Sequence, residues 1–381
     1  MTPPSTKPRI AIIGPVYPYR AGISHCTVRL AEELARDFDV QIVSFARQYP
    51  KRFYPGGSDI DPTLESRRPG QARFTLDILN PLSWIAEGRR LQREKLEAVI
   101  FVWWIWVWAL PYRVLLGFLR GRTKVVFQCH NIADKEPARW KTALTNGALR
   151  TANAIVVHAR TEADEVVRRL GESARARVTS LFLPLHELGG EAPSRAEART
   201  TLGITHDNVA LCFGHVRPFK GLDIALSAWK GMKTPVLLLV AGEVWWDDRA
   251  TYERLIDELE IRERVRCDFR FIPDSEVATY FAASDVVLTP YRHEAQSGVA
   301  MTAFHFLRPV IATAVGGLPE LIRDGENGLL IPPEDPNALR EAVEQFFSRS
   351  DRRAMSDRIS SELGEYSWRR YADTIGSLLS G

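Results

Sequence analysis

Short apolar runs alternate along this chain with longer stretches in which apolar residues recur at helical spacing. In the first half, the runs predict strands near residues 8–14, 39–45, 98–105, 124–128 and 154–158. The stretches between and after them predict helices near residues 23–36, 82–95, 110–120, 138–151 and 161–170. A second series predicts strands near 209–214, 235–241, 265–271, 285–288, 309–312 and 329–331, each but the last followed by a helix or a helical turn. This alternation is typical of parallel sheets that are covered by helices.

Residues 180–198 break both periodicities with proline, glycine and charged residues, so they are expected to connect two halves. A chain of 381 residues is also long for a single core. We therefore expect an α/β protein of two Rossmann-like domains that face each other across a cleft, with the ligand at the carboxyl ends of the strands. The predicted domains are residues 1–188 and 189–361, and residues 362–381 form a helix that packs back on the first domain.

The composition is that of a soluble globular enzyme, with 45% hydrophobic and 25% charged residues. A net charge of +3 gives no reason to expect a nucleic-acid partner. The four cysteines are scattered without a metal-binding spacing, and they suit a reducing compartment. Neither a signal peptide nor a transmembrane helix is predicted, because the most apolar run, residues 98–110, is shorter than the roughly 20 residues that span a bilayer. These features favour a cytoplasmic location.

A basic loop, HVRPFKGLD, directly follows the predicted strand VALCFG and precedes a helix. It places Arg217 and Lys220 at the carboxyl end of a strand. A guanidinium can bind phosphate oxygens in a fork and an ammonium acts as a point charge, so this loop suits a nucleotide diphosphate. The alternative is an ordinary solvated basic loop.

The segment HEAQSGVAMTAF, residues 293–304, joins a glutamate to a predicted helix start at Ser297 and Gly298. The first amides of a helix have no partner within it and lie beside the positive end of its dipole, where phosphate binds. Ser297 is otherwise an ordinary N-cap. Further on, Gly316 and Gly317 follow a strand, where they allow either a close ligand approach or a tight turn.

Several of these segments together resemble one family. GHVRPFKGLD, the glutamate at position 294, and PVIAT followed by GGLPELIRDGENG resemble the nucleotide-binding half of retaining glycosyltransferases of family four. GPVYPYRAGISHCTVRLAEELA resembles the family's glycine loop and first helix, and FQCHNIADKEP resembles its strand-end histidine segment. The resemblance covers most of the chain and implies the two-domain arrangement called GT-B.

The resemblance also implies roles for individual residues. Arg217 and Lys220 would bind the donor diphosphate, and Glu294 would accept hydrogen bonds from hydroxyls of the donor sugar. His130 would lie near the transferred sugar, and Gly22 would let the first helix approach the phosphates. The backbone amides that would meet the phosphate belong to Ser297, Gly298 and Val299.

Two positions depart from the family pattern. The first loop has Ala21 and Gly22 where the family has two glycines, and Thr302 stands where the family has a second glutamate, eight positions after Glu294. Thr302 lies one helical turn beyond Gly298, so its side chain is expected to face the nucleotide and to reach at most one ribose hydroxyl. The alternative is that its hydroxyl donates to a carbonyl one turn back.

Other stretches have weaker implications. His158 ends the strand after the one that carries His130, and it is as readily structural as functional. Base recognition is expected near residues 243–246 and 271–273, without a pattern that identifies the base.

No acidic residue occurs from Ala98 to Ala133, a stretch that carries four tryptophans and several basic residues. Residues 98–124 therefore suit an anionic membrane surface, or alternatively a buried strand with a covering helix.

The sequence thus predicts a retaining glycosyltransferase that moves a sugar from a nucleotide-sugar to a glycan or lipid-linked acceptor. No metal-ligand spacing is visible, so neither a metal nor another cofactor is expected. Two alternatives stay open. One is a sugar-nucleotide epimerase of similar fold, which would turn over without an acceptor. The other is a catalytically silent nucleotide-sugar binder, which the threonine at position 302 suggests.

Overall fold

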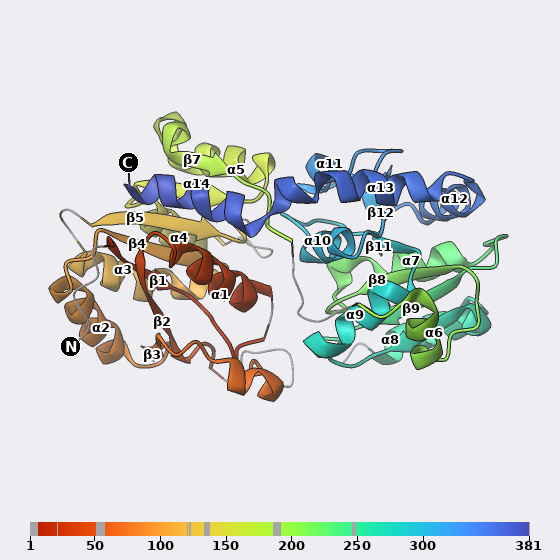
Figure 1. Cartoon of the computed structure of the whole chain (residues 1–381), viewed down its shortest axis with the longest axis horizontal. Coiled ribbons are helices and arrows are strands. Elements are labelled where there is room, and N and C mark those ends of the chain that lie inside the picture. Colours follow the sequence, from red (N-terminus) through yellow and green to blue (C-terminus); the bar gives the residue numbers. More distant parts are fainter. Residues whose placement is uncertain are drawn as a thin grey trace. The chain divides into compact units, whose positions relative to one another are not determined.

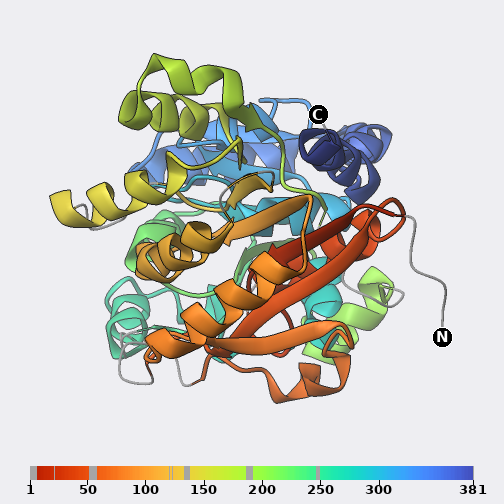
Figure 2. The ribbon, with the colours of Figure 1, turned by 90° about the vertical axis from the view of Figure 1, so that its left-hand side faces the viewer.

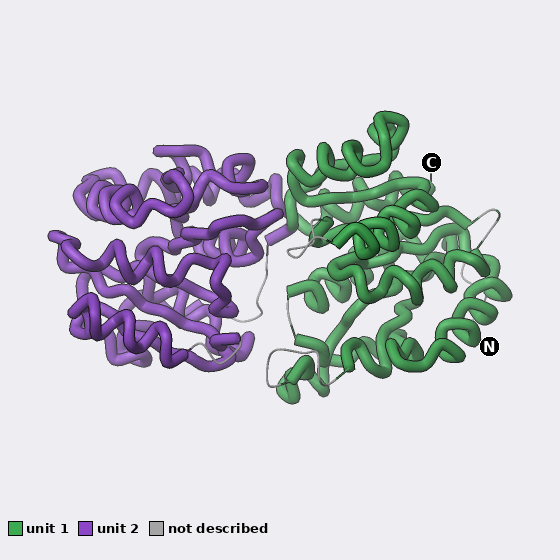
Figure 3. Tube along the Cα trace, turned by 180° about the vertical axis from the view of Figure 1, so that it is seen from behind, with its two compact units in different colours: residues 1–183, 367–381 green, residues 184–366 purple. Residues whose placement is uncertain are grey.

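The computed structural model describes residues 7–20, 22–50, 58–119, 121, 123–132, 138–185, 192–245 and 249–380. The chain forms two compact units, residues 1–183 with 367–381, and residues 184–366 (Figure 3). The boundary expected after residue 188 falls among residues outside the described ranges. The last residues of the chain, from Ser367 on, belong to the first unit.

The first unit contains a seven-stranded parallel sheet in the order β3-β2-β1-β4-β5-β6-β7 (Figure 1). Its strands are β1 (Arg9–Ile13), β2 (Asp39–Arg47), β3 (Ala72–Asp77), β4 (Ala98–Trp103), β5 (Lys124–Cys129), β6 (Ala154–Val157) and β7 (Val178–Ser180). Its helices are α1 (Gly22–Leu34), α2 (Pro81–Arg93), α3 (Ala109–Phe118), α4 (Arg139–Leu149), α5 (Arg160–Leu170) and α14 (Trp368–Ser380).

Side-chain alternation along the central strands builds two helical layers on this sheet. Phe101 and Trp103 of β4 belong to one core cluster with residues of α2, α3 and α4, whereas Ile100 and Val102, which alternate with them, do not. Helix α3 packs against both α2 and α4, and α14 packs against α1 (Figure 1, Figure 2). Every residue of β4 is buried, because the sheet is covered on both faces at its centre.

The second unit contains a six-stranded parallel sheet in the order β10-β9-β8-β11-β12-β13. Its strands are β8 (Val209–Phe213), β9 (Leu237–Ala241), β10 (Val265–Asp268), β11 (Val286–Thr289), β12 (Val310–Thr313) and β13 (Gly328–Ile331). Its helices are α6 (Arg195–Leu202), α7 (Leu222–Trp229), α8 (Arg249–Glu258), α9 (Asp274–Ala283), α10 (Gly298–His305), α11 (Leu318–Leu321), α12 (Pro336–Ser348) and α13 (Arg352–Glu362). Helices α7, α8 and α12 share one core cluster with β8, β9 and β11–β13.

The structure confirms the predicted α/β class and each strand expected from an apolar run, but strands β3 and β7 and helices α6, α12 and α13 were missed. Strand β3 lies at one edge of its sheet and has a single buried residue, Leu76, so it shows no apolar run. Strand β7, at the other edge, has only three residues. The connection expected over residues 180–198 was too long, because α6 starts inside it at Arg195. Ser194 and Glu197 form a capping box there, which is a sequence signal for that helix start.

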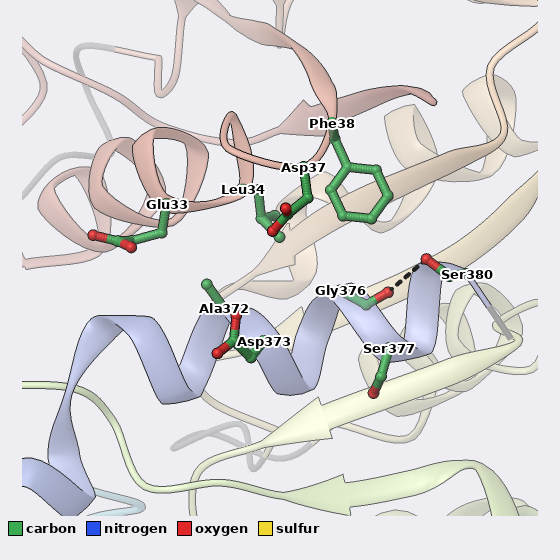
Figure 4. A pocket seen from close by; sticks show the side chains of 9 residues that line it. All are labelled: Glu33, Leu34, Asp37, Phe38, Ala372, Asp373, Gly376, Ser377 and Ser380. Carbon is green, nitrogen blue, oxygen red and sulfur yellow. Dashed lines mark hydrogen bonds between the residues drawn. The ribbon is translucent and has the colours of Figure 1, made fainter. Parts of the chain in front are cut away.

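A small open pocket lies in the first unit between α14 and the end of α1 (Figure 4). It is lined by Glu33, Leu34, Asp37, Phe38, Ala372, Asp373, Gly376, Ser377 and Ser380. None of the site residues expected from the sequence lines it.

Among the described residues, no helix has the length and apolar character needed to cross a bilayer.

The contact between α2 and α3 explains the glycine at position 88 of α2, and Gly117 of α3 provides a matched comparison. A Cβ at Gly88 would lie 2.3 Å from Cδ2 of Phe118, whereas a Cβ at Gly117 would meet nothing within 4 Å. We expect Gly88→Ala to lower the free energy of unfolding by roughly 1–3 kcal/mol, because Phe118 must be displaced. Gly117→Ala should instead be neutral or raise it by up to about 1 kcal/mol, because alanine is the better helix former. Urea unfolding of both variants measures the difference, and equal effects would contradict this packing.

Candidate functional site

The site residues of the second unit gather where its strand order reverses. Strand β8 leads to β9 on one side, and the chain later returns to form β11 on the other side of β8, with Val286 opposite Ala210. In doubly wound sheets, ligands bind at the carboxyl ends of the strands at this switch point. The loops that follow β8 and β11 carry the basic loop and the Glu294 segment.

Lys220 and Glu294, which lie 74 residues apart in sequence, form an ion pair between these two loops. Lys220 ends the 3-10 turn η5 (Pro218–Lys220), and its Nζ donates to Glu294 Oε2 at 2.6 Å. Gly221 makes the approach possible, since its φ is +69° and a Cβ there would lie 2.0 Å from the carbonyl oxygen of Pro290. The two loops therefore meet closely only with glycine at position 221.

The pair is largely shielded from water, because the Lys220 and Glu294 side chains are only 22% and 15% exposed. Burial lowers the pKa of the Lys220 ammonium, but its interactions with Tyr291 and Glu294 outweigh that effect and leave the pKa raised above its ordinary value. The ammonium also lies 3.8 Å from the centre of the Tyr291 ring. Lys220 is thus held charged at neutral pH.

Arg217 lies over an aromatic ring from the neighbouring loop after β9. Its guanidinium carbon is 3.5 Å from the centre of the Trp245 ring, which His215 approaches edge-on with ring centres 4.8 Å apart. Backbone hydrogen bonds join the two loops, from Val216 N to the Glu243 oxygen at 2.9 Å and from Trp245 N to the Val216 oxygen at 3.2 Å. Trp245, which packs against Arg217, therefore belongs to the stretch 243–246 that was expected to recognise the base. Trp246 lies outside the described residues.

The start of α10 has the geometry expected at a phosphate-binding helix terminus. Ser297 is its N-cap, and its side chain accepts a hydrogen bond from Ala300 N at 3.2 Å. The first bond of the helix repeat runs from Met301 N to the Ser297 oxygen at 3.1 Å. The amides of Gly298 and Val299 precede it and point out of the helix end. Capping and anion binding are compatible here, because they use different groups.

Thr302 forms the hydrogen bond within the helix that was considered as the alternative to ribose binding. Its hydroxyl donates to the Gly298 oxygen at 2.8 Å, and the residue is only 5% exposed. The hydroxyl expected to reach a ribose is therefore engaged within α10.

Gly316 allows a close approach of the backbone at Glu294, not of a ligand. Its φ is +55°, and a Cβ there would lie 1.6 Å from the carbonyl oxygen of Glu294, while Gly317 N donates to the Ala295 oxygen at 2.9 Å. The loop after β12 thus supports the backbone on which Glu294 stands.

Two residues of this region were not anticipated from the sequence. Tyr291 lies beneath Lys220, and Arg292 clamps the basic loop by donating to both carboxylate oxygens of Asp223, at 2.9 and 2.6 Å. Arg292 Nε also donates to Glu334 at 2.7 Å. Their positions directly before HEAQSG were the available signal, but an aromatic and a basic residue after a strand have no specific pattern.

The other two expected site residues, His130 and Gly22, belong to the first unit. Gly22 starts α1, and Ala21 lies outside the described residues. His130 follows β5, its backbone N–H donates to the Trp103 oxygen at 2.8 Å, and its ring lies 4.9 Å from that of His158. His130 and His158, on neighbouring strands, are thus brought together at the carboxyl edge of the sheet.

His158 is a buried, neutral partner in this pair. It is 2% exposed and its Nδ1–H donates to the Leu181 oxygen at 3.2 Å. Burial lowers its pKa from 6.5 to about 4, although the bond to Leu181 acts in the opposite direction. Tyr371 of α14 packs on the His158 ring and accepts a hydrogen bond from Gln128 Nε2 at 2.9 Å.

The tryptophan-rich stretch is mostly interior. Trp103 and Trp108 are 2% and 0% exposed, as expected for a buried strand with a covering helix. Leu110 at the start of α3 and Trp140 on α4 are nevertheless 53% and 54% exposed. Arg120 and Arg122 lie outside the described residues. Contact with a membrane stays a prediction.

Among the described residues, no cluster of three or more His, Cys, Asp or Glu side chains is placed to hold a metal.

The loop after β12 yields a test of the Glu294 support. Gly316 and Gly325 both have left-handed φ values, +55° and +78°, but a Cβ at Gly325 would meet nothing within 4 Å. Gly325→Ala should cost about 1–2 kcal/mol of unfolding free energy from backbone strain alone. Gly316→Ala should cost roughly 2 kcal/mol more, because the Glu294 backbone must move as well. Denaturant unfolding of both variants is the measurement, and similar losses would show that the contact is easily relieved.

The state of His158 yields a second test. The unfolded chain binds a proton at this residue below pH 6.5, whereas the folded protein does so only near pH 4. The stabilisation from neutral His158 is therefore complete above pH 6.5 and is lost as pH falls toward 4, by about 3 kcal/mol at most. His158→Gln should show a smaller fall in unfolding free energy between pH 7 and pH 4.5 than the wild-type protein. An unchanged fall in His158→Gln would contradict the neutral assignment.

Each of the two units matches a known protein family. Residues 194–361 match the family described as glycosyl transferases group 1, and residues 20–183 match glycosyltransferase family 4. D-inositol 3-phosphate glycosyltransferase of Saccharomonospora viridis is 31% identical over 59% of this chain and 54% of its own length. That of Mycobacterium leprae is 35% identical over 48% of this chain and 44% of its own. The matches thus span about half the length of these curated relatives.

Solved structures show the same fold. HepE of Anabaena in complex with UDP and glucose has a TM-score of 0.79 at 16% identity, over 98% of this chain and 99% of that one. Sucrose-phosphate synthase of Thermosynechococcus elongatus has a TM-score of 0.75 at 19% identity, over 98% of both chains. The GT-B fold class is thereby confirmed, and with both units matched by family models, the chain belongs to the group 1, family 4 glycosyltransferases.

Proposed function

We propose that this protein transfers a sugar from a nucleotide-sugar donor to a glycan or lipid-linked acceptor with retention of anomeric configuration. The observation that carries the proposal is the Lys220–Glu294 pair, which joins a cation and a sugar-binding carboxylate at the switch point of the second unit. Membership of the family supports the reaction class. The names of relatives and neighbours support a nucleotide-sugar donor, since HepE was solved with UDP-glucose.

The second unit would supply charge stabilisation for the leaving group. As the bond between the sugar and the diphosphate breaks, negative charge grows on the phosphate oxygens. The Arg217 guanidinium, the Lys220 ammonium and the first amides of α10 are fixed before the donor arrives, so they stabilise this charge without reorganisation. Two protein cations and a helix terminus can do this work without a metal ion.

Glu294 and His130 would act on the sugar. Glu294 would accept hydrogen bonds from sugar hydroxyls while Lys220 holds its other oxygen. His130 would contact the transferred sugar from the first unit. In a front-face reaction, the acceptor oxygen attacks the carbon that the diphosphate leaves, on the same face, and the departing phosphate oxygen takes the acceptor proton. This route needs no second carboxylate of the glycosidase kind.

The acceptor and the location extend the proposal. The curated relatives are named for inositol 3-phosphate, which makes a phosphorylated cyclitol one acceptor to test beside glycans and lipid-linked sugars. We place the reaction in the cytoplasm, with residues 98–124 at an anionic inner-leaflet surface. The exposed Leu110 and Trp140 side chains support that placement.

A catalytically silent binder is the second candidate, and Thr302 is the observation that favours it. The hydroxyl of Thr302 is engaged with Gly298, so no side chain at this position offers the second carboxylate of the family pattern. Such a protein would bind the donor but neither hydrolyse nor transfer it.

A donor screen followed by an acceptor screen tests the proposal. UDP-, GDP- and ADP-sugars are first compared by thermal shift, where a ligand at a hundred times its dissociation constant adds roughly 2.7 kcal/mol of stability. The stabilising donor is then incubated alone and with inositol 3-phosphate, oligosaccharides or polyprenyl-linked sugars. A glycosylated product with the donor's anomeric configuration is expected. Epimerised donor formed without acceptor, or binding without any turnover, would contradict the proposed activity.

Removing either cation should weaken donor binding strongly. Lys220→Ala or Arg217→Ala takes away a charged hydrogen bond to the diphosphate worth roughly 1.5–3 kcal/mol, which is about ten- to a hundredfold in affinity. Lys230→Ala, an exposed lysine at the end of α7, is the matched control and should bind as the wild type does. Calorimetric titration of the donor measures all three. Wild-type affinity in both site variants would remove the basic loop from the donor site.

A further inference from the structure

Two cations and three aromatic rings alternate at the carboxyl edge of β8. Arg217 lies 3.5 Å from the Trp245 ring centre and 5.8 Å from that of Phe219. Lys220 lies 5.5 Å from the same Phe219 ring and 3.8 Å from the Tyr291 ring. The order Trp245–Arg217–Phe219–Lys220–Tyr291 is called here the cation ladder. Its rings come from three different loops, after β8, β9 and β11.

The outer rings of the ladder are fixed by burial. Trp245 and Tyr291 are 8% and 3% exposed, so neither can rotate freely. The central ring of Phe219 stacks on His293 with ring centres 5.0 Å apart and planes 26° apart. Each cation therefore lies close to one buried ring and near the Phe219 ring that the two cations share.

A diphosphate site must hold two positive charges close together, which is energetically unfavourable before the ligand binds. Two like charges confined to one loop repel each other, and each would be more stable in water than in a partly closed site. The face of an aromatic ring is electronegative and attracts a cation, more strongly where water is excluded. The rings therefore add an attraction that neutralises neither cation, and at Lys220 this attraction acts beside the ion pair with Glu294.

We infer that Trp245 and Tyr291 are positioning residues that hold Arg217 and Lys220 in place for the two phosphates of the donor. This inference rests on the proposed function, and it assigns part of the diphosphate affinity to side chains that do not themselves contact phosphate. The rings act through the cations, so their removal weakens binding of the diphosphate rather than of the nucleoside.

Paired substitutions separate the aromatic face from the volume of the side chain. Trp245→Phe and Tyr291→Phe keep a ring, whereas Trp245→Met and Tyr291→Leu keep apolar bulk without one. The probe is inorganic pyrophosphate, which carries the diphosphate charge without base or sugar, measured beside UDP, GDP and ADP and their nucleosides. Phe347→Leu is the control, since Phe347 lies beneath Arg352 with 5.5 Å to the ring centre, at the far end of α12.

The expected result is a loss of about tenfold in pyrophosphate and nucleoside diphosphate affinity for Trp245→Met and for Tyr291→Leu. Nucleoside affinity should not change, the phenylalanine variants should stay within about threefold of wild type, and Phe347→Leu should bind normally. Wild-type diphosphate affinity in the ring-free variants, or an equal loss for nucleosides, would overturn the inference and leave the proposed function standing. A wild-type protein that binds neither pyrophosphate nor any nucleoside diphosphate would overturn both.

Discussion

The ion pair between Lys220 and Glu294 is the interaction on which the candidate site depends. It joins two loops at the point where the strand order of the second unit reverses, and its 2.6 Å length requires the loops to meet closely. Glycines make this possible, because Gly221 and Gly316 bring neighbouring backbone within distances that a Cβ would occupy. The charge arrangement of the site is therefore built by backbone packing as much as by side chains.

Around that pair, both cations of the basic loop lie against aromatic rings, which attract a cation without cancelling its charge. Lys220 has one carboxylate partner and one aromatic face, and Arg217 lies against the Trp245 ring. The start of α10 adds amides that its own helix does not use. These groups are fixed in advance, and preorganised positive charge of this kind is what the departure of a nucleotide diphosphate requires. The first unit carries a separate pair, His130 beside a neutral, buried His158.

Much of this was accessible from the sequence, for physical reasons that differ between residues. Buried parallel strands such as β4 are continuous apolar runs, and so they were found, whereas the half-exposed edge strand β3 has no such signal. Arg217, Lys220, Glu294 and Ser297 were expected from strand-end positions and the family resemblance. Tyr291 and Arg292 act through contacts between loops that are distant in sequence, which no local pattern encodes. The same holds for the contact of Trp245 with Arg217, although residues 243–246 were expected to contribute to the site. The Ser194–Glu197 capping box shows a signal that was present and overlooked.

We propose that the Lys220–Glu294 region binds the diphosphate of a nucleotide-sugar. The most direct measurement is a crystal structure of the protein with the nucleoside diphosphate that stabilises it most. We expect phosphate oxygens within hydrogen-bonding distance of Lys220 Nζ, the Arg217 guanidinium and the first amides of α10. A diphosphate bound elsewhere, with the Lys220–Glu294 pair out of its reach, would contradict it.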